Sequence, residues 1–275
     1  MKRISLTLFV MVATFFGSWF INSCSTVPIT GRQQLNLLPE SQLIQMSMTN
    51  YDQFLGEHKL SDDRRKTDMV KRVGENISKA VIEYMQKNGM GNRIDNFKWE
   101  FNLIEEDVPN AWCMPGGKVV VYTGILPYAK TEGGLAVIMG HEVAHAVARH
   151  GNERMSQAML IETGGLALAA AIDEKPEETK QLFMMAYGVG TAVGVSLPYS
   201  RSHETEADKL GLIFMAMAGY NPNEAVDFWQ RMSEAGGQKP PEFLSTHPSD
   251  QTRIEDLKAY MPEAMKYYKN GRPRP

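Results

Sequence analysis

Residues 141–145 read His-Glu-Val-Ala-His, which places two imidazoles and one carboxylate on a short stretch of chain. Positions i and i+4 of a helix are about 40° apart around its axis, so His141 and His145 can converge on one metal ion. Glu142 projects beside that ion and can accept a proton from a water molecule that the metal activates. The motif therefore predicts a hydrolytic zinc site with His141 and His145 as ligands and Glu142 as the general base.

A catalytic zinc usually takes three protein ligands and keeps a further position for water, so a third ligand is needed. His150 follows His145 by five residues, about 140° around a continuous helix, and is expected to be a positive residue near the helix C-terminus. The metzincin spacing of a third histidine is absent. The candidate segment is 202–208, Ser-His-Glu-Thr-Glu-Ala-Asp, in which Glu204 and Asp208 share a helical face. One of these two can bind zinc while the other hydrogen-bonds a ligand.

The elements that must position these residues can be predicted from periodicity. Apolar residues recur at helical spacing over 64–88, and the chain is mostly helical from Glu132 onward. Apolar and polar residues alternate over 97–103, as in a half-buried strand, and 115–117 (Pro-Gly-Gly) separates the two arms of a hairpin. These elements predict one domain of the α+β class, mostly helical with a small sheet, over residues 41–268.

Two further predicted helices, over 155–172 and 177–197, are rich in small residues. Gly190 and Gly194 are spaced for close contact between helices. Because acidic residues lie nearby, we interpret this spacing as tight packing in the core rather than as a membrane motif. Another helix is predicted over 203–218, ending before a glycine.

The N-terminal 24 residues are typical of a bacterial lipoprotein signal peptide. Lys2 and Arg3 give a positive start, residues 4–21 are apolar or small, and Cys24 closes the segment. The ending Ile-Asn-Ser-Cys resembles a lipobox, whose cysteine receives lipid, although the asparagine departs from the usual pattern. The alternative is an uncleaved membrane helix, because a run of about 18 apolar residues can just span a bilayer.

The lipoprotein hypothesis predicts a lipid anchor at Cys24 and a location in the cell envelope, facing the periplasm. Because Ser25 is not acidic, we expect the outer membrane. Residues 25–40 are polar, contain prolines and are expected to form a tether, and 269–275 are expected to be a disordered tail. Cleavage would leave Cys113 as the only thiol, which excludes a disulfide. With a net charge of −3, the chain offers no electrostatic reason to expect a nucleic-acid partner.

Several motifs follow one another in the order found in a known family. They are 27–32 (Val-Pro-Ile-Thr-Gly-Arg) with 34–36 (Gln-Leu-Asn), 110–112 (Asn-Ala-Trp) with 115–117 (Pro-Gly-Gly), 141–145, 204–208, and 246–248 (Thr-His-Pro) with Arg253 and Ile254. On these motifs the chain resembles the gluzincin zinc peptidases that include the HtpX heat-shock proteases and the CAAX prenyl proteases. It looks most like their periplasmic, lipoprotein-anchored branch.

The resemblance implies a zincin-like domain and roles for individual residues. It implies that Glu204, rather than His203 or Glu206, is the third zinc ligand and that Asp208 supports the site. The small sheet would have an edge strand that flanks the zinc-binding helix and binds an extended peptide by main-chain pairing.

The segment that matches this edge strand is Asn110, Ala111 and Trp112, for which the alternative is a plain core hairpin. His247 is expected close to the zinc, with three possible roles. It would fill the open zinc position as a latch, donate to the oxyanion on the substrate, or only pack its own loop. Cys113 is expected to be a buried or partly buried free thiol, without an assigned function.

These expectations together predict an endopeptidase with one Zn²⁺ per chain that hydrolyses extended, unfolded or misassembled polypeptides at the bacterial envelope. The rival hypothesis is an envelope chaperone or assembly factor with a largely structural zinc. Glu142 and a three-ligand set count against the rival, because structural zinc sites use four ligands rich in cysteine. A zinc amidase acting on cell-wall peptides would share the His-Glu-x-x-His motif but not the other motifs.

Overall fold

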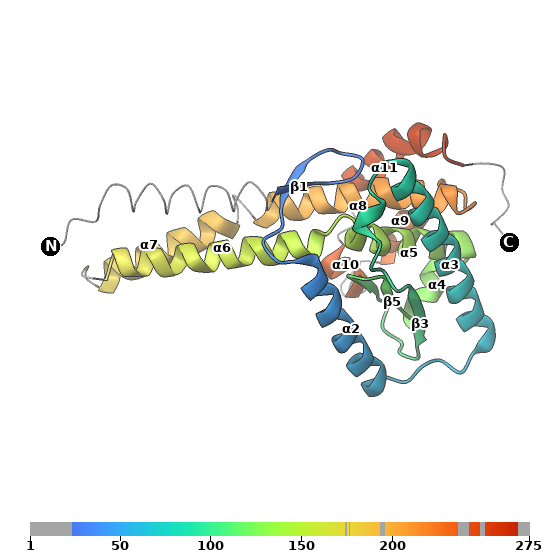
Figure 1. Ribbon diagram of the computed structural model, residues 1–275, viewed down its shortest axis with the longest axis horizontal. Coiled ribbons are helices and arrows are strands. Elements are labelled where there is room, and N and C mark those ends of the chain that lie inside the picture. The colour runs from blue at the N-terminus through green and yellow to red at the C-terminus, as the bar shows by residue number, and fades with distance from the viewer. Residues whose placement is uncertain are drawn as a thin grey trace.

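The computed structural model describes residues 24–173, 175, 177–192, 196–235, 242–247 and 251–268 (Figure 1). The predicted signal peptide up to residue 23 and the predicted tail 269–275 lie outside these ranges. The strands are β1 (Cys24–Thr26), β2 (Gln33–Leu35), β3 (Glu100–Ile104), β4 (Ala111–Met114) and β5 (Lys118–Tyr122). The helices are α2 (Glu40–Glu57), α3 (Arg64–Lys87), α4 (Leu126–Ala129), α5 (Glu132–Val147), α6 (His150–Ala171), α7 (Glu177–Thr191), α8 (Leu197–Met217), α9 (Glu224–Ala235), α10 (Glu242–Thr246) and α11 (Gln251–Ala264). The predicted α+β class, mostly helical with little sheet, is confirmed.

Helix α5, which carries the zinc motif, is the buried centre of the fold. Every residue from Gly133 to Val147 is buried, as expected for a segment that is apolar on nearly all sides. The helix begins at a side-chain cap, because Thr131 Oγ1 accepts a hydrogen bond from the backbone N–H of Gly134. Helices α3 and α8 and strand β4 pack around α5, so the motif lies at the meeting point of the helical and sheet parts.

Two glycines allow α8 to approach α5 where the zinc motif lies. A Cβ atom added to Gly211 of α8 would lie 2.9 Å from the backbone nitrogen of His141, which is closer than real Cβ contacts. A Cβ atom added to Gly140 of α5 would lie 3.0 Å from the carbonyl oxygen of Gly211. A side chain at position 211 would therefore push the helices apart and move the acidic segment of α8 away from the motif.

The three-stranded sheet has the order β3-β5-β4, in which β3 is parallel and β4 antiparallel to β5. Strands β4 and β5 form the predicted hairpin. Its turn includes Gly116 and Gly117 at φ angles of 89° and 82°, which glycine adopts without steric cost. Strand β4 is an edge strand of this sheet and packs against α5. The expected edge strand beside the zinc-motif helix is therefore present.

The segment 24–35, most of which we expected to be a tether, is instead packed into the domain. Strands β1 and β2 pair in an antiparallel ladder, and Val27 between them is 1% exposed and belongs to the main core. Gln34 is buried and its Nε2 donates to the carbonyl oxygen of Ala148 at 2.9 Å. A polar segment can pack in this way because hydrogen bonds and ion pairs, rather than a repeating apolar pattern, hold it.

Helices α6 and α7 pack against each other and extend away from the rest of the domain (Figure 1). Leu166 and Met185 on these helices are 67% and 68% exposed. A Cβ atom at Gly190 would meet no atom within 4 Å, so this glycine makes no close helix contact, and Gly194 lies outside the described residues. Across the described ranges, we find no helix with the length and apolar character needed to cross a bilayer.

Candidate metal centre

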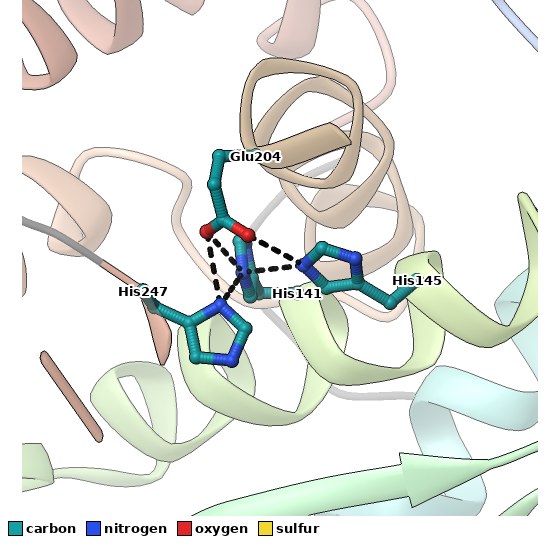
Figure 2. A group of neighbouring side chains, drawn as sticks. All are labelled: His141, His145, Glu204 and His247. Carbon is teal, nitrogen blue, oxygen red and sulfur yellow. Dashed lines mark hydrogen bonds and ion pairs between the residues drawn. The ribbon is translucent and has the colours of Figure 1, made fainter. Parts of the chain in front are cut away.

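His141 and His145 on α5 and Glu204 on α8 direct their polar atoms toward one point (Figure 2). The Nε2 atoms of the two histidines are 3.0 Å apart. One carboxylate oxygen of Glu204 lies 3.3 Å from Nε2 of His141, and the other lies 3.3 Å from Nε2 of His145. The two histidines are 2% and 6% exposed, so bulk water has little access to these donors. The structure thus brings together the three residues expected to bind zinc.

His247 contributes a fourth donor to the same group, from the residue that follows α10. Its Nδ1 lies 3.0 Å from Nε2 of His141 and 2.9 Å from Oε2 of Glu204. The backbone holds this position, because the N–H of His247 donates to the carbonyl of Phe243 and the N–H of Phe243 donates to that of Pro109. The phenyl ring of Phe243 also packs on the imidazole, with centroids 4.7 Å apart.

The four residues fit a zinc ion by chemistry and by spacing. One donor atom from each of His141, His145, Glu204 and His247 lies within 4.8 Å of every other. Zinc prefers nitrogen and carboxylate donors of this kind, and tetrahedral donors about 2.0–2.1 Å from the ion are about 3.3 Å apart. The separations of 2.9 to 3.3 Å between contacting donor atoms are close to that requirement, with a different oxygen of Glu204 facing each of His141 and His145.

Glu142 lies beside this group with one carboxylate oxygen unused. It is 4% exposed, and its Oε1 has no hydrogen-bond partner among the described residues. Nε2 of His247 lies 3.3 Å from Oε1 but not in hydrogen-bond geometry. Burial raises the pKa of Glu142, which makes its carboxylate a stronger proton acceptor.

Asp208 contacts the ring of His141 on the side away from the donor group, and Arg253 holds Asp208 in turn. Nδ1 of His141 lies 2.9 Å from Oδ1 of Asp208. The guanidinium of Arg253 donates to Asp208 through Nε at 2.8 Å and through Nη2 at 2.7 Å. Burial alone would raise the pKa of Asp208, but Arg253 and His141 outweigh it and lower that pKa. A carboxylate in this position keeps Nε2 of His141 free for a metal.

Comparison with protein families decides the class of this site. A model of peptidase family M48 matches residues 71–261, which include both the zinc motif and Glu204. The chain belongs to peptidase family M48. By family it is a zinc metalloendopeptidase, and the resemblance stated from the sequence is confirmed at this level; its finer placement in a lipoprotein branch stays a prediction.

This M48 peptidase is similar to at least two kinds of protease. The mitochondrial metalloendopeptidase OMA1 of Schizosaccharomyces pombe is 34% identical over 90% of this chain and 69% of the relative. Human OMA1 is 30% identical over 94% of this chain and 50% of the relative. The beta-barrel assembly-enhancing protease of Escherichia coli is 26% identical over 87% of this chain and 48% of the relative. The chain thus spans about half the length of human OMA1 and of the Escherichia coli protease, and about two thirds of the Schizosaccharomyces pombe protein.

His150 of the M48 peptidase does not lie where the helical spacing predicted. It is fully buried at the start of α6, and its Nδ1 is 2.8 Å from Nδ1 of His145. The chain turns at Arg149, whose φ is 62°, so α5 ends before His150 and a rotation of 100° per residue no longer applies. Burial lowers the pKa of His150 to about 4, which contradicts the expected positive charge.

Arg253 is a site residue to which sequence reasoning gave no role, although it lies in a motif shared with the family. It is 7% exposed, and its guanidinium lies 3.4 Å from the ring centroid of Trp229. Stacking on an aromatic ring and pairing with Asp208 together allow an arginine to be buried. A lone arginine after the His-Pro motif was the only signal in the sequence, and it does not specify either partner.

The predicted substrate segment, Asn110 to Trp112, lies at the start of strand β4, at the edge of the three-stranded sheet. Ala111 is buried and pairs with Val121 of β5. The indole Nε1 of Trp112 donates to the hydroxyl of Tyr122 at 3.3 Å. The carbonyl of Asn110 accepts a hydrogen bond from the N–H of Tyr122, so this residue extends the β4–β5 pairing by one step. Cys113 on the same strand is a half-buried free thiol, as expected.

Proposed function

We propose that this M48 peptidase is an endopeptidase that hydrolyses unfolded or misassembled polypeptides at the bacterial cell envelope. His141, His145 and Glu204 would hold one zinc ion, which when bound lowers the pKa of water and polarises a carbonyl. The observation that carries the proposal is the convergence of these three donors beside Glu142, a buried carboxylate with an unused oxygen. A purely structural zinc site has no need of such a carboxylate.

Glu142, Asp208 and Arg253 have the remaining roles in catalysis and in positioning the ligands. Glu142 accepts the proton of the attacking water and returns it to the leaving amine, and its raised pKa suits both transfers near neutral pH. Asp208 and Arg253 keep the ring of His141 oriented, so that its Nε2 faces the ion rather than solvent.

The edge strand β4 supports an extended substrate. It pairs with β5 on one side only in the described sheet, so the other side offers main-chain groups for β-augmentation. Pairing of this kind recognises the backbone and needs a segment in extended form, which folded proteins seldom expose. The M48 peptidase would therefore prefer unfolded chains.

The envelope location rests on the N-terminal sequence, with its positive start, apolar run and Ile-Asn-Ser-Cys ending. In this proposal Cys24 carries lipid and the catalytic domain faces the periplasm from the outer membrane. One relative, the beta-barrel assembly-enhancing protease of Escherichia coli, carries a name that ties it to assembly of β-barrel proteins. By analogy with that name, we propose β-barrel polypeptides that have not assembled as substrates of this chain.

The test is digestion of casein by the purified protein before and after removal of zinc with a chelator. We expect digestion to stop on chelation and to return with added zinc, and Glu142→Gln to be inactive in both cases. Digestion that continues without metal would overturn the proposal. The rival role as a chaperone would be favoured by a different result: the protein never digests casein, yet it still suppresses the aggregation of an unfolded test protein after chelation.

A further inference from the structure

The N-terminal motif 27–36 contributes no donor to the metal centre, yet two of its side chains reach Glu206 on α8. Nε of Arg32 lies 2.9 Å from Oε1 of Glu206, and Nη2 lies 2.9 Å from Oε2. The hydroxyl of Thr30 donates to Oε1 of the same carboxylate at 2.8 Å. Glu206 is 3% exposed, so the protein rather than water satisfies this carboxylate.

His150 connects that carboxylate to the metal centre. Its Nε2 lies 3.1 Å from Oε2 of Glu206, and its Nδ1 lies 2.8 Å from Nδ1 of His145. His145 directs its other nitrogen, Nε2, at the donor group, 3.0 Å from Nε2 of His141. A series of contacts therefore leads from His145 through His150 to Glu206 and Arg32.

The direction of each hydrogen bond in this series of contacts follows from which groups can donate and which can only accept. An ionised carboxylate only accepts. Oε1 of Glu206 receives Nε–H of Arg32 and the hydroxyl of Thr30, and Oε2, which faces His150, receives an N–H group from Nη2 of Arg32. Nε2 of His150 must then carry a proton and donate it to Glu206. Nδ1 of a neutral His150 is left as an acceptor, so Nδ1 of His145 donates and Nε2 of His145 keeps its lone pair for the metal.

We propose that His150 is a positioning residue for the zinc ligand His145, held in the required tautomer by Glu206 and Arg32. The inference rests on the proposed metal centre and explains why a motif near the N-terminus accompanies the zinc motif. The two ligand histidines would then be oriented by carboxylates of one helix. Asp208 acts directly on His141, and Glu206 acts on His145 through His150.

A purely structural role would predict a different outcome, and His203 is the matched control. It is as buried as His150, stacks on that ring with centroids 4.3 Å apart, and contacts Glu153 Oε2 at 2.8 Å. Glu153 in turn pairs with Arg32. Removing either imidazole thus disturbs one buried network, but His150 contacts the zinc ligand His145 through a ring nitrogen, whereas His203 hydrogen-bonds Glu153 and stacks on His150.

The experiment compares His150→Leu, His150→Asn and His203→Leu in the purified full chain. The readouts are the zinc dissociation constant from competition with a chromophoric chelator, the absorption spectrum of the cobalt(II) form, and the thermal unfolding midpoint. We expect His150→Leu to weaken zinc binding by about 10- to 100-fold and to alter the cobalt spectrum. His150→Asn, whose Oδ1 can replace Nδ1 as the acceptor, should recover much of the affinity. His203→Leu should lower the unfolding midpoint and leave the zinc affinity unchanged.

Unchanged zinc affinity and cobalt spectrum in folded His150→Leu would overturn the inference. An equal loss of affinity in His203→Leu would also overturn it, because the effect would then come from general loosening of the network. If His150→Leu does not fold, Glu206→Gln replaces it with the same expected loss of affinity. The inference concerns the zinc affinity of each variant relative to that of the wild type. Chelator-sensitive digestion of casein by the wild type therefore tests the proposed function separately.

Discussion

His247 places its Nδ1 2.9 Å from Oε2 of Glu204, although 43 residues separate them. With zinc bound, the imidazole would therefore be the fourth ligand, in the place that a catalytic zinc usually keeps for water or substrate. Of the three roles considered for His247, this geometry favours the latch. An oxyanion donor would have to face the substrate from outside the ligand set.

Replacing His247 with alanine is expected to raise peptidase activity. If the latched form makes up about nine tenths of the protein, removing it raises turnover about tenfold. The measurement is kcat/KM on a quenched fluorescent peptide, with zinc content determined on the same sample. A fall by orders of magnitude would instead identify an oxyanion donor, and unchanged turnover would leave only a packing role.

Replacing Glu142 with glutamine is expected to lower kcat by about 10²- to 10⁴-fold, since general-base catalysis contributes that much. Zinc should remain bound at one ion per chain, because Glu142 is not among the four grouped donors. Glu204→Ala is the comparison, and it should weaken zinc binding itself. Loss of zinc from folded Glu142→Gln would contradict the assignment of Glu142 as a base.

Glu153 is expected to make stability depend on pH in the acid range. Burial raises its pKa, but the hydrogen bonds from Arg32 and His203 outweigh burial and lower the pKa to about 2. The folded pKa is thus below the unfolded value of about 4.3, so the stabilisation is fully present above pH of about 4.3 and is lost as pH falls toward 2. Unfolding midpoints of metal-free wild type and Glu153→Gln should converge as the pH is lowered from about 5 to about 2.5, a range that begins above this window and covers most of it. A difference that stays constant over this range would contradict the prediction.

Cys24 is expected to carry lipid, because it closes a segment with the features of a lipoprotein signal. Mass spectrometry of the mature N-terminus should detect a modified Cys24 as the first residue. Cys24→Ala should leave the protein unprocessed or release it from membranes. An intact Met1, or an unmodified Cys24 in membrane-bound protein, would contradict the expectation.

The exposed arm of α6 and α7 is expected to contribute little to the stability of the domain. Leu166→Ser and Met185→Ser should each change the free energy of unfolding by less than about 0.5 kcal/mol, as exposed positions usually do. Ile138→Ala in the fully buried part of α5 should cost about 2–5 kcal/mol. Urea unfolding of the three variants provides the comparison. Losses on the arm as large as that of Ile138→Ala would show that its apolar side chains are buried in solution.

The sequence by itself determined the parts of the site that depend on local spacing. The i, i+4 histidines with Glu142, the acidic segment of α8 and the hairpin at Gly116 and Gly117 were predicted at the positions where they lie. Such features depend on helix or turn geometry over a few residues, which the chain encodes directly.

Only the tertiary structure decided what surrounds that site. His150 turns back onto His145 because one residue, Arg149, adopts a positive φ and ends the helix early, and periodicity contains no sign of this change. Arg32 meets Glu206 across 174 residues, in a segment whose polar composition predicted a tether. Contacts of this kind depend on how helices and strands pack together, so no local pattern reports them, and the residues that orient the zinc ligands became visible only in the folded chain.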